Sequence, residues 1–277
     1  MAHAGQRSIV QSRYRVMSVR GIPLYLQSSL LWTVGLLLIF LFVSNRDATE
    51  AMSTVTAAAL TLVSVVIHEY GHALAGRALG VSVTDVVIHV FFGMTRMEQP
   101  GTPRREMLIG VAGPAANLVV AGALYPWTRD PEHWDGLLPQ SMIATLFVVN
   151  VVLGTVNLIP AFPMDGGRIL RAALTGPLGE VNATRVAVAI GRFVGIMAIV
   201  SPLIVGVYRW SVALPIAGFV LLYLGESETR RVALRAEDQR VHRWLEDVSR
   251  MSDLAADPHD ANTPDEDEDP TAPLADE

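Results

Sequence analysis

The chain has 277 residues, of which 51% are hydrophobic and only 17% are charged. Soluble domains carry about 25% charged residues, so this composition is low in charge. There is no cysteine, and all 21 basic residues are arginine, which excludes disulfides, cysteine-ligated metals, cysteine nucleophiles and lysine Schiff bases. Ten acidic residues lie in 253–277, and the rest of the chain is only mildly basic, which argues against a nucleic-acid-binding protein.

Uncharged runs long enough to cross a bilayer, which takes about 20 residues, recur along the chain. We therefore predict a mainly α, polytopic membrane protein with a six-span core at 21–225. The alternative is a soluble protein with buried helices, but uncharged runs of this length are rare outside membranes. The six expected spans are 21–43, 51–79, 107–127, 136–164, 193–208 and 211–225.

Arginines flank the predicted core. Four of them precede the first span, so we expect residues 1–20 to be a cytoplasmic N-terminal segment. The arginine excess in the other inward-facing segments places both termini in the cytoplasm and makes 226–250 a cytoplasmic helical extension. Residues 251–277 are acidic and almost devoid of large apolar side chains, so we expect a disordered tail.

Residues 81–98, between the second and third spans, have a different pattern. They are rich in β-branched residues and partly alternate, which predicts a short membrane-associated β-region with a turn near Gly93. A strand pair beside a membrane helix presents an unpaired edge. The alternative is an ordinary cytoplasmic hairpin.

A short histidine motif lies near the inner end of the second span. His68 and His72 are four residues apart, so both imidazoles lie on one face of a helix and can bind one metal ion. Glu69 lies beside them, within reach of a metal-bound water. Ionisable groups within an apolar span are costly, which makes them functional candidates. The alternative is a pair of structural histidines bonded to neighbouring helices.

A catalytic zinc site needs a third protein ligand, with water in the fourth position. Asp165 is the best candidate, because it ends a long apolar run and is the only acid between Asp135 and Glu180. Pro160 and Pro163 interrupt the helix before it. Irregular backbone at membrane depth persists only when it is buried in protein or lines a wet cavity. The alternative for Asp165 is a helix cap or a turn.

Four other polar residues are weaker candidates. The Asn157 amide can donate to a developing oxyanion, or equally can form a helix–helix hydrogen bond. Asn117 lies in a stretch of small residues that favours close helix packing, so we expect it to be structural. His89 lies on a predicted strand and His133 in a loop, and we interpret both as non-ligands.

Together these motifs resemble those of the site-2 protease family, the intramembrane zinc metalloproteases. The matching stretches are HEYGH at 68–72, GPAAN at 113–117 and NLIPAFPMDGGR at 157–168. Many family members carry PDZ or CBS domains, for which this sequence has no room. The resemblance is therefore to a compact bacterial type in a bacterial cell membrane.

The resemblance implies residue roles: one zinc ion per chain held by His68, His72 and Asp165, with Glu69 as the catalytic base and Asn157 as an aid to the transition state. It also implies an endopeptidase that cuts transmembrane segments of membrane proteins, in regulated intramembrane proteolysis. The expected partners are the lipid bilayer and such a substrate, and the sequence favours no particular oligomeric state. The substrate is expected to bind as an added strand, at an edge near Val86, Val87 and Ile88.

Two other functions use the same histidine pair. A membrane zinc transporter would use it as a transit site, but transport needs polar residues through several spans, and here they concentrate at one depth. A catalytically inactive scaffold would hold membrane proteins, but it has no need of Glu69.

Overall fold

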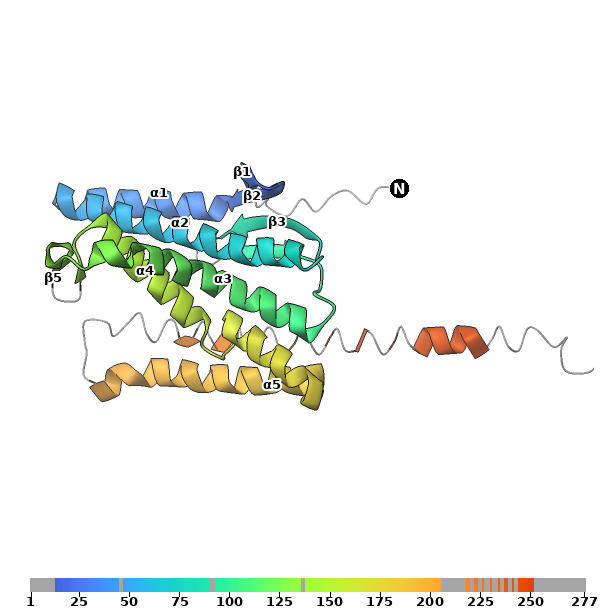
Figure 1. The fold of residues 1–277 in the computed structure, drawn as a ribbon. Coiled ribbons are helices and arrows are strands. Elements are labelled where there is room, and N and C mark those ends of the chain that lie inside the picture. The colour runs from blue at the N-terminus through green and yellow to red at the C-terminus, as the bar shows by residue number, and fades with distance from the viewer. Residues whose placement is uncertain are drawn as a thin grey trace, which may run out of the picture. The chain divides into compact units, whose positions relative to one another are not determined.

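The computed structural model describes residues 13–44, 47–89, 93–135 and 138–205, together with short helical stretches between 218 and 251. Contacts divide the chain into two units, 1–230 and 231–277. The first unit contains helices α1 to α5 and a small mixed sheet (Figure 1). In the second, residues 244–251 are helical. This confirms a mainly α fold with a β-region between the second and third helices.

Within the described part of the chain, three helices are long and apolar enough to cross a membrane: 48–78, 103–128 and 165–201. The two shorter apolar helices are α1 and α4. Helix α5 is broken at Gly179, whose φ of 75° is non-helical. The helices are α1 (Ser28–Val43), α2 (Ala48–Ala78), α3 (Pro103–Leu124), α4 (Met142–Asn157) and α5 (Asp165–Val205), with short 3-10 turns at Tyr125–Thr128 and Pro131–His133 and a two-residue strand pair, β5 (Trp134–Asp135) and β6 (Leu138–Pro139).

The expected span boundaries were wrong in three places. The first apolar run begins as a strand and becomes helical only at Ser28. An uncharged run indicates that a segment is buried, but it does not distinguish a strand from a helix. The fourth span ends at Asn157, before the prolines, and not at 164. Helical structure in the fifth region starts at Asp165 and not at 193. The sixth span and the acidic tail lie largely or wholly outside the described residues.

The helix ends follow from local sequence. Thr102 and Ser141 cap α3 and α4, since their hydroxyl oxygens accept from the N–H groups of Arg105 and Ala144. Helix α2 ends at Ala78 with Leu79 as its C-cap, and Gly80 adopts a φ of +76° that turns the chain toward the sheet.

The sheet has four strands in the order β1-β2-β3-β4. Strands β2 and β3 are parallel, because α1 and α2 connect them, and the other two pairs are antiparallel. The hairpin of β1 and β2 was not expected from the sequence. The strands are β1 (Arg13–Val19), β2 (Ile22–Gln27), β3 (Val83–Ile88) and β4 (Gly93–Met97).

The expected edge at Val86, Val87 and Ile88 was wrong. These residues lie on β3, a central strand that pairs with β2 on one side and β4 on the other. All three are buried, with at most 1% of their surface exposed. The N-terminal hairpin adds two strands to the predicted pair, so that β1 and β4 are the edge strands of the sheet as far as the structure describes it.

The sheet packs on the C-terminal end of α2. Ile22, Leu24 and Val86 form a buried cluster with Tyr70 and Ala73 of the helix. The Tyr70 hydroxyl also donates to the Ile22 carbonyl oxygen at 3.1 Å. Each large apolar side chain buried in this way contributes about 1.5–3 kcal/mol, so the sheet fixes the histidine-bearing turns of α2.

Helix α3 contacts α2, α4 and α5. An ion pair joins it to α5, in which the Arg171 guanidinium donates to the Glu106 carboxylate. Helix α3 therefore brings the start of α5 close to the C-terminal end of α2.

Candidate metal centre

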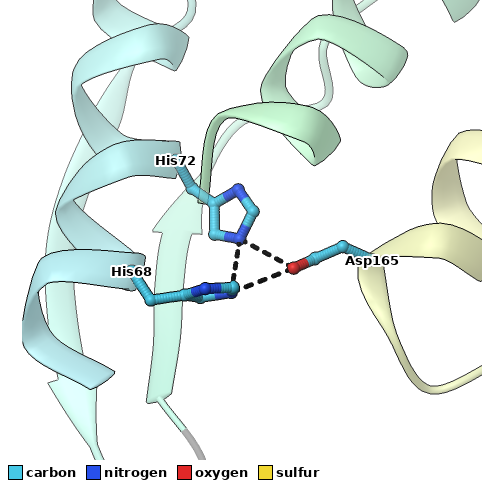
Figure 2. Close-up of side chains that lie close together, drawn as sticks. All are labelled: His68, His72 and Asp165. Carbon is cyan, nitrogen blue, oxygen red and sulfur yellow. Dashed lines mark hydrogen bonds and ion pairs between the residues drawn. The ribbon is translucent and has the colours of Figure 1, made fainter. Parts of the chain in front are cut away.

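Three side chains from two distant parts of the chain meet at one point. His68 and His72 project from α2, and Asp165 is the first residue of α5 (Figure 2). Asp165 Oδ2 lies 3.0 Å from His68 Nε2 and 3.1 Å from His72 Nε2, and the two nitrogens are 3.2 Å apart. All three residues are at most 7% exposed. Among the described residues they form the only group of this kind that could hold a metal ion.

The spacing of these atoms suits zinc. Zinc binds nitrogen and oxygen at about 2.0–2.2 Å, so neighbouring atoms of a tetrahedral site lie about 3.3 Å apart. The observed separations of 3.0, 3.1 and 3.2 Å are slightly shorter. One ion fits among the three atoms if they move apart by a few tenths of an ångström.

Both histidines offer Nε2 to this point because Nδ1 is already bonded. His68 Nδ1 lies 2.6 Å from Asn117 Oδ1, and His72 Nδ1 lies 2.7 Å from the Ile109 carbonyl oxygen. Each of these oxygens only accepts, so the ring proton is on Nδ1 and the Nε2 lone pair is available. Two Nε2 lone pairs and a carboxylate oxygen directed at one point are a donor set for a cation.

Glycines allow α2 and α3 to approach at the site. A methyl group added at Gly71 would lie 2.6 Å from the Ala112 carbonyl oxygen, and one added at Gly113 would lie 2.3 Å from His72 Nε2. Real side chains do not approach so closely, so both positions require glycine while the helices keep this separation. The GPAAN stretch therefore contributes to the site by leaving room for the ligands.

A tight turn places Asp165. Gly166 and Gly167 pack against the backbone of 158–164, where an added methyl group would lie 2.1 Å from the Ile159 carbonyl oxygen and 2.5 Å from the Phe162 nitrogen respectively. Arg168, one turn along α5, lies 3.6 Å from Asp165 Oδ1. The ion pair leaves Oδ2 directed at the histidines.

The side chain of Glu69 extends from α2 to the sheet. It is 7% exposed, and the Thr95 hydroxyl lies 2.7 Å from its Oε2 and 3.0 Å from its backbone oxygen. A methyl group added at Gly93 would lie 2.3 Å from Glu69 Cγ. Strand β4 thus packs directly on the carboxylate.

Among the described residues, His89 and His133 lie outside the group of side chains that could hold a metal ion. The Asn157 amide donates to the Leu153 carbonyl oxygen at 2.9 Å, a bond within its own helix. Burial, with the positive charges of Arg13 and Arg96, lowers the pKa of His89, so its ring is neutral at pH 7. The interpretation of His89 and His133 as non-ligands stays a prediction.

Asn117 contacts a candidate ligand, although the sequence suggested only a packing role. Asn150, its hydrogen-bond partner on α4, was not among the candidate residues predicted from the sequence. Both are fully buried. The available signal was an amide within an otherwise apolar span, where polar side chains are costly.

Comparison with known proteins identifies the family. The model of peptidase family M50 matches residues 56–128 and 135–200, which include the histidine motif and Asp165. The chain belongs to peptidase family M50. A site-2 protease from Methanocaldococcus jannaschii has a similar structure, with a TM-score of 0.58 and 28% sequence identity over 79% of this chain and 95% of that one.

A zinc metalloprotease of Methanocaldococcus jannaschii is 30% identical over 220 residues. The match covers 79% of this chain but 61% of that relative, so the chain spans under two thirds of its length. The family assignment confirms the resemblance to site-2 proteases and agrees with zinc as the metal.

Proposed function

We propose that this chain is a zinc-dependent intramembrane endopeptidase that cuts transmembrane segments of membrane proteins. The observation that carries the proposal is the meeting of His68, His72 and Asp165 within membrane-length helices. When bound there, zinc supplies a Lewis acid and lowers the pKa of water to about 7. The two histidines and the aspartate are the proposed ligands.

Glu69 is the proposed general base. Glu69 directly follows His68, a proposed ligand, on α2, and the Thr95 hydroxyl restrains the Glu69 carboxylate. The carboxylate takes a proton from water at the site and then gives it to the leaving amine of the cut peptide bond. Asn157 keeps a proposed role as a donor to the developing oxyanion.

The proposed substrate adds to the sheet at β4. A peptide bond within a helix is shielded, and its carbonyl is already hydrogen-bonded, so the cut segment must be extended. Strand β4 is an edge of the sheet among the described residues, and it carries Gly93 and Thr95 against Glu69. Backbone pairing with this edge would bring an extended segment next to the base and the ligands.

The proposed location is a bacterial cell membrane, with both termini in the cytoplasm. The apolar helices support a membrane location, and the arginine distribution supports the orientation. We propose 226–250 as a cytoplasmic extension and 251–277 as a solubilising tail.

The test is the Glu69→Gln substitution, with Glu98→Gln as the control because Glu98 is exposed. Cells that express the wild type, Glu69→Gln or Glu98→Gln are compared by proteomics of membrane-protein fragments. We expect fragments in the wild type and the control, loss of those fragments in Glu69→Gln, and equal zinc content in all three purified proteins.

Identical fragments in the wild type and Glu69→Gln would overturn the proposed function. Zinc flux into proteoliposomes in the absence of fragments would support a transporter instead. The absence of both fragments and flux would support a scaffold.

A further inference from the structure

We propose that Asn150 sets the tautomer and orientation of His68 by acting through Asn117. The inference deepens the proposed function, because it rests on the zinc site named above. Asn150 lies on α4, a helix that contributes no residue to the metal-binding group. Asn150, Asn117 and Ser64 are each 0% exposed, so water does not compete for their hydrogen bonds.

The orientation of the Asn150 amide is fixed by two acceptors. Its nitrogen donates to Ser64 Oγ at 2.9 Å and to the Leu146 carbonyl oxygen at 2.8 Å. The Ser64 hydroxyl donates its own proton to the Leu60 carbonyl oxygen at 2.9 Å, so toward Asn150 it can only accept. Both amide hydrogens of Asn150 are thus engaged, and its oxygen faces Asn117.

The oxygen of Asn150 in turn fixes Asn117. The Asn117 nitrogen donates to Asn150 Oδ1 at 2.7 Å and to the Ser64 backbone oxygen at 3.1 Å. Its two hydrogens are therefore used, and its oxygen is left to face His68 Nδ1 at 2.6 Å. An amide oxygen only accepts, so His68 carries its proton on Nδ1 and directs the Nε2 lone pair to the metal.

Rotating the Asn117 amide by about 180°, so that its nitrogen and oxygen change places, would break this chain of hydrogen bonds. Its nitrogen would then face His68 Nδ1, and its oxygen would face two other oxygens, leaving buried groups without partners. The histidine proton would move to Nε2 and block the metal. Asn150 prevents this reversal without contacting His68, which makes it a positioning residue.

The two histidine ligands therefore differ in what supports them. His72 Nδ1 is bonded to a backbone carbonyl oxygen, that of Ile109, which no side-chain substitution removes. His68 depends on a relay of two side chains from α3 and α4. Substitutions far from the ligands should therefore alter zinc binding through His68.

The test measures zinc affinity of the full-length purified protein by competition with a chelator. We expect Asn117→Leu and Asn150→Leu each to weaken zinc binding, by about 10- to 100-fold for the first and about tenfold for the second. Because Asn150 acts through Asn117, the double variant should bind zinc within about twofold of Asn117→Leu alone. Asn182→Leu, which removes an exposed amide from α5, is the matched control and should bind like the wild type.

Unchanged affinity in Asn150→Leu, or losses that multiply in the double variant, would overturn the relay. If Asn150→Leu fails to fold, Ser64→Ala replaces it, because this change removes one acceptor of the Asn150 amide. It should weaken zinc binding measurably, and wild-type affinity would refute the proposal. Asp165→Ala separates the two claims: wild-type zinc affinity in that variant refutes the metal site itself, whereas zinc loss there with no effect of Asn150→Leu refutes only the relay.

Discussion

Gly113 of α3 lies against His72 of α2, so closely that an added methyl group would be 2.3 Å from the His72 Nε2 atom and 2.9 Å from that of His68. The space that a side chain would occupy is therefore next to the two nitrogens that the metal needs. Gly113, which has no side chain, thus leaves the space in which the ligand atoms can meet.

Gly113→Ala should sharply reduce zinc binding, because the methyl group displaces an imidazole or pushes α3 from α2. We expect at least about a tenfold loss of zinc affinity, comparable to the loss of a group that supports a ligand. The control is Gly122→Ala on the same helix, where the added methyl group would meet no described atom within 4 Å beyond the adjacent helix backbone. Equal zinc contents in the two purified variants would show that the close approach is not needed.

Thr95→Val should slow cleavage without releasing zinc. The substitution removes the hydroxyl that holds the Glu69 carboxylate but keeps a β-branched side chain on β4. A hydrogen bond to a charged group is worth about 1.5–3 kcal/mol, so we expect the rate to fall by about tenfold or more. The measurement is the cleavage rate of a substrate found by the fragment comparison, together with zinc content.

Two variants control that experiment. Thr95→Ser retains the hydroxyl and should recover most of the rate, whereas Thr84→Val makes the same change at an exposed position of β3 and should have no effect. A Thr95→Ser enzyme as slow as Thr95→Val would mean that packing, and not the hydroxyl, matters there.

Glu106→Gln should destabilise the protein, because it breaks the ion pair between Glu106 and the buried Arg171 that joins α3 to α5. Their side chains are 16% and 10% exposed, and breaking a buried pair costs about 3 kcal/mol or more. The comparison is Glu226→Gln, which breaks an exposed pair with Arg192 and should change stability by less than about 1 kcal/mol. Thermal unfolding in detergent measures both, and equal shifts would contradict the prediction.

The fold class followed from composition and run length, because a bilayer requires long uncharged helices whatever their packing. The element types within those runs did not follow. Ile22–Gln27 is as apolar as a helix and forms a strand, since it finds a partner in β3, far along the chain. The observed edge of the sheet differs from the predicted one for the same reason. Which strands are neighbours depends on pairing between segments that are far apart in the sequence.

The sequence by itself indicated which three side chains meet at the candidate site. Four-residue spacing puts His68 and His72 on one helix face, and a lone aspartate after two prolines stands out in an apolar run. Only the tertiary structure decided which groups orient these ligands. Asn117, Asn150 and Thr95 lie on separate elements and carry no local spacing signal, because their hydrogen bonds to α2 exist only once α3, α4 and β4 have packed against it.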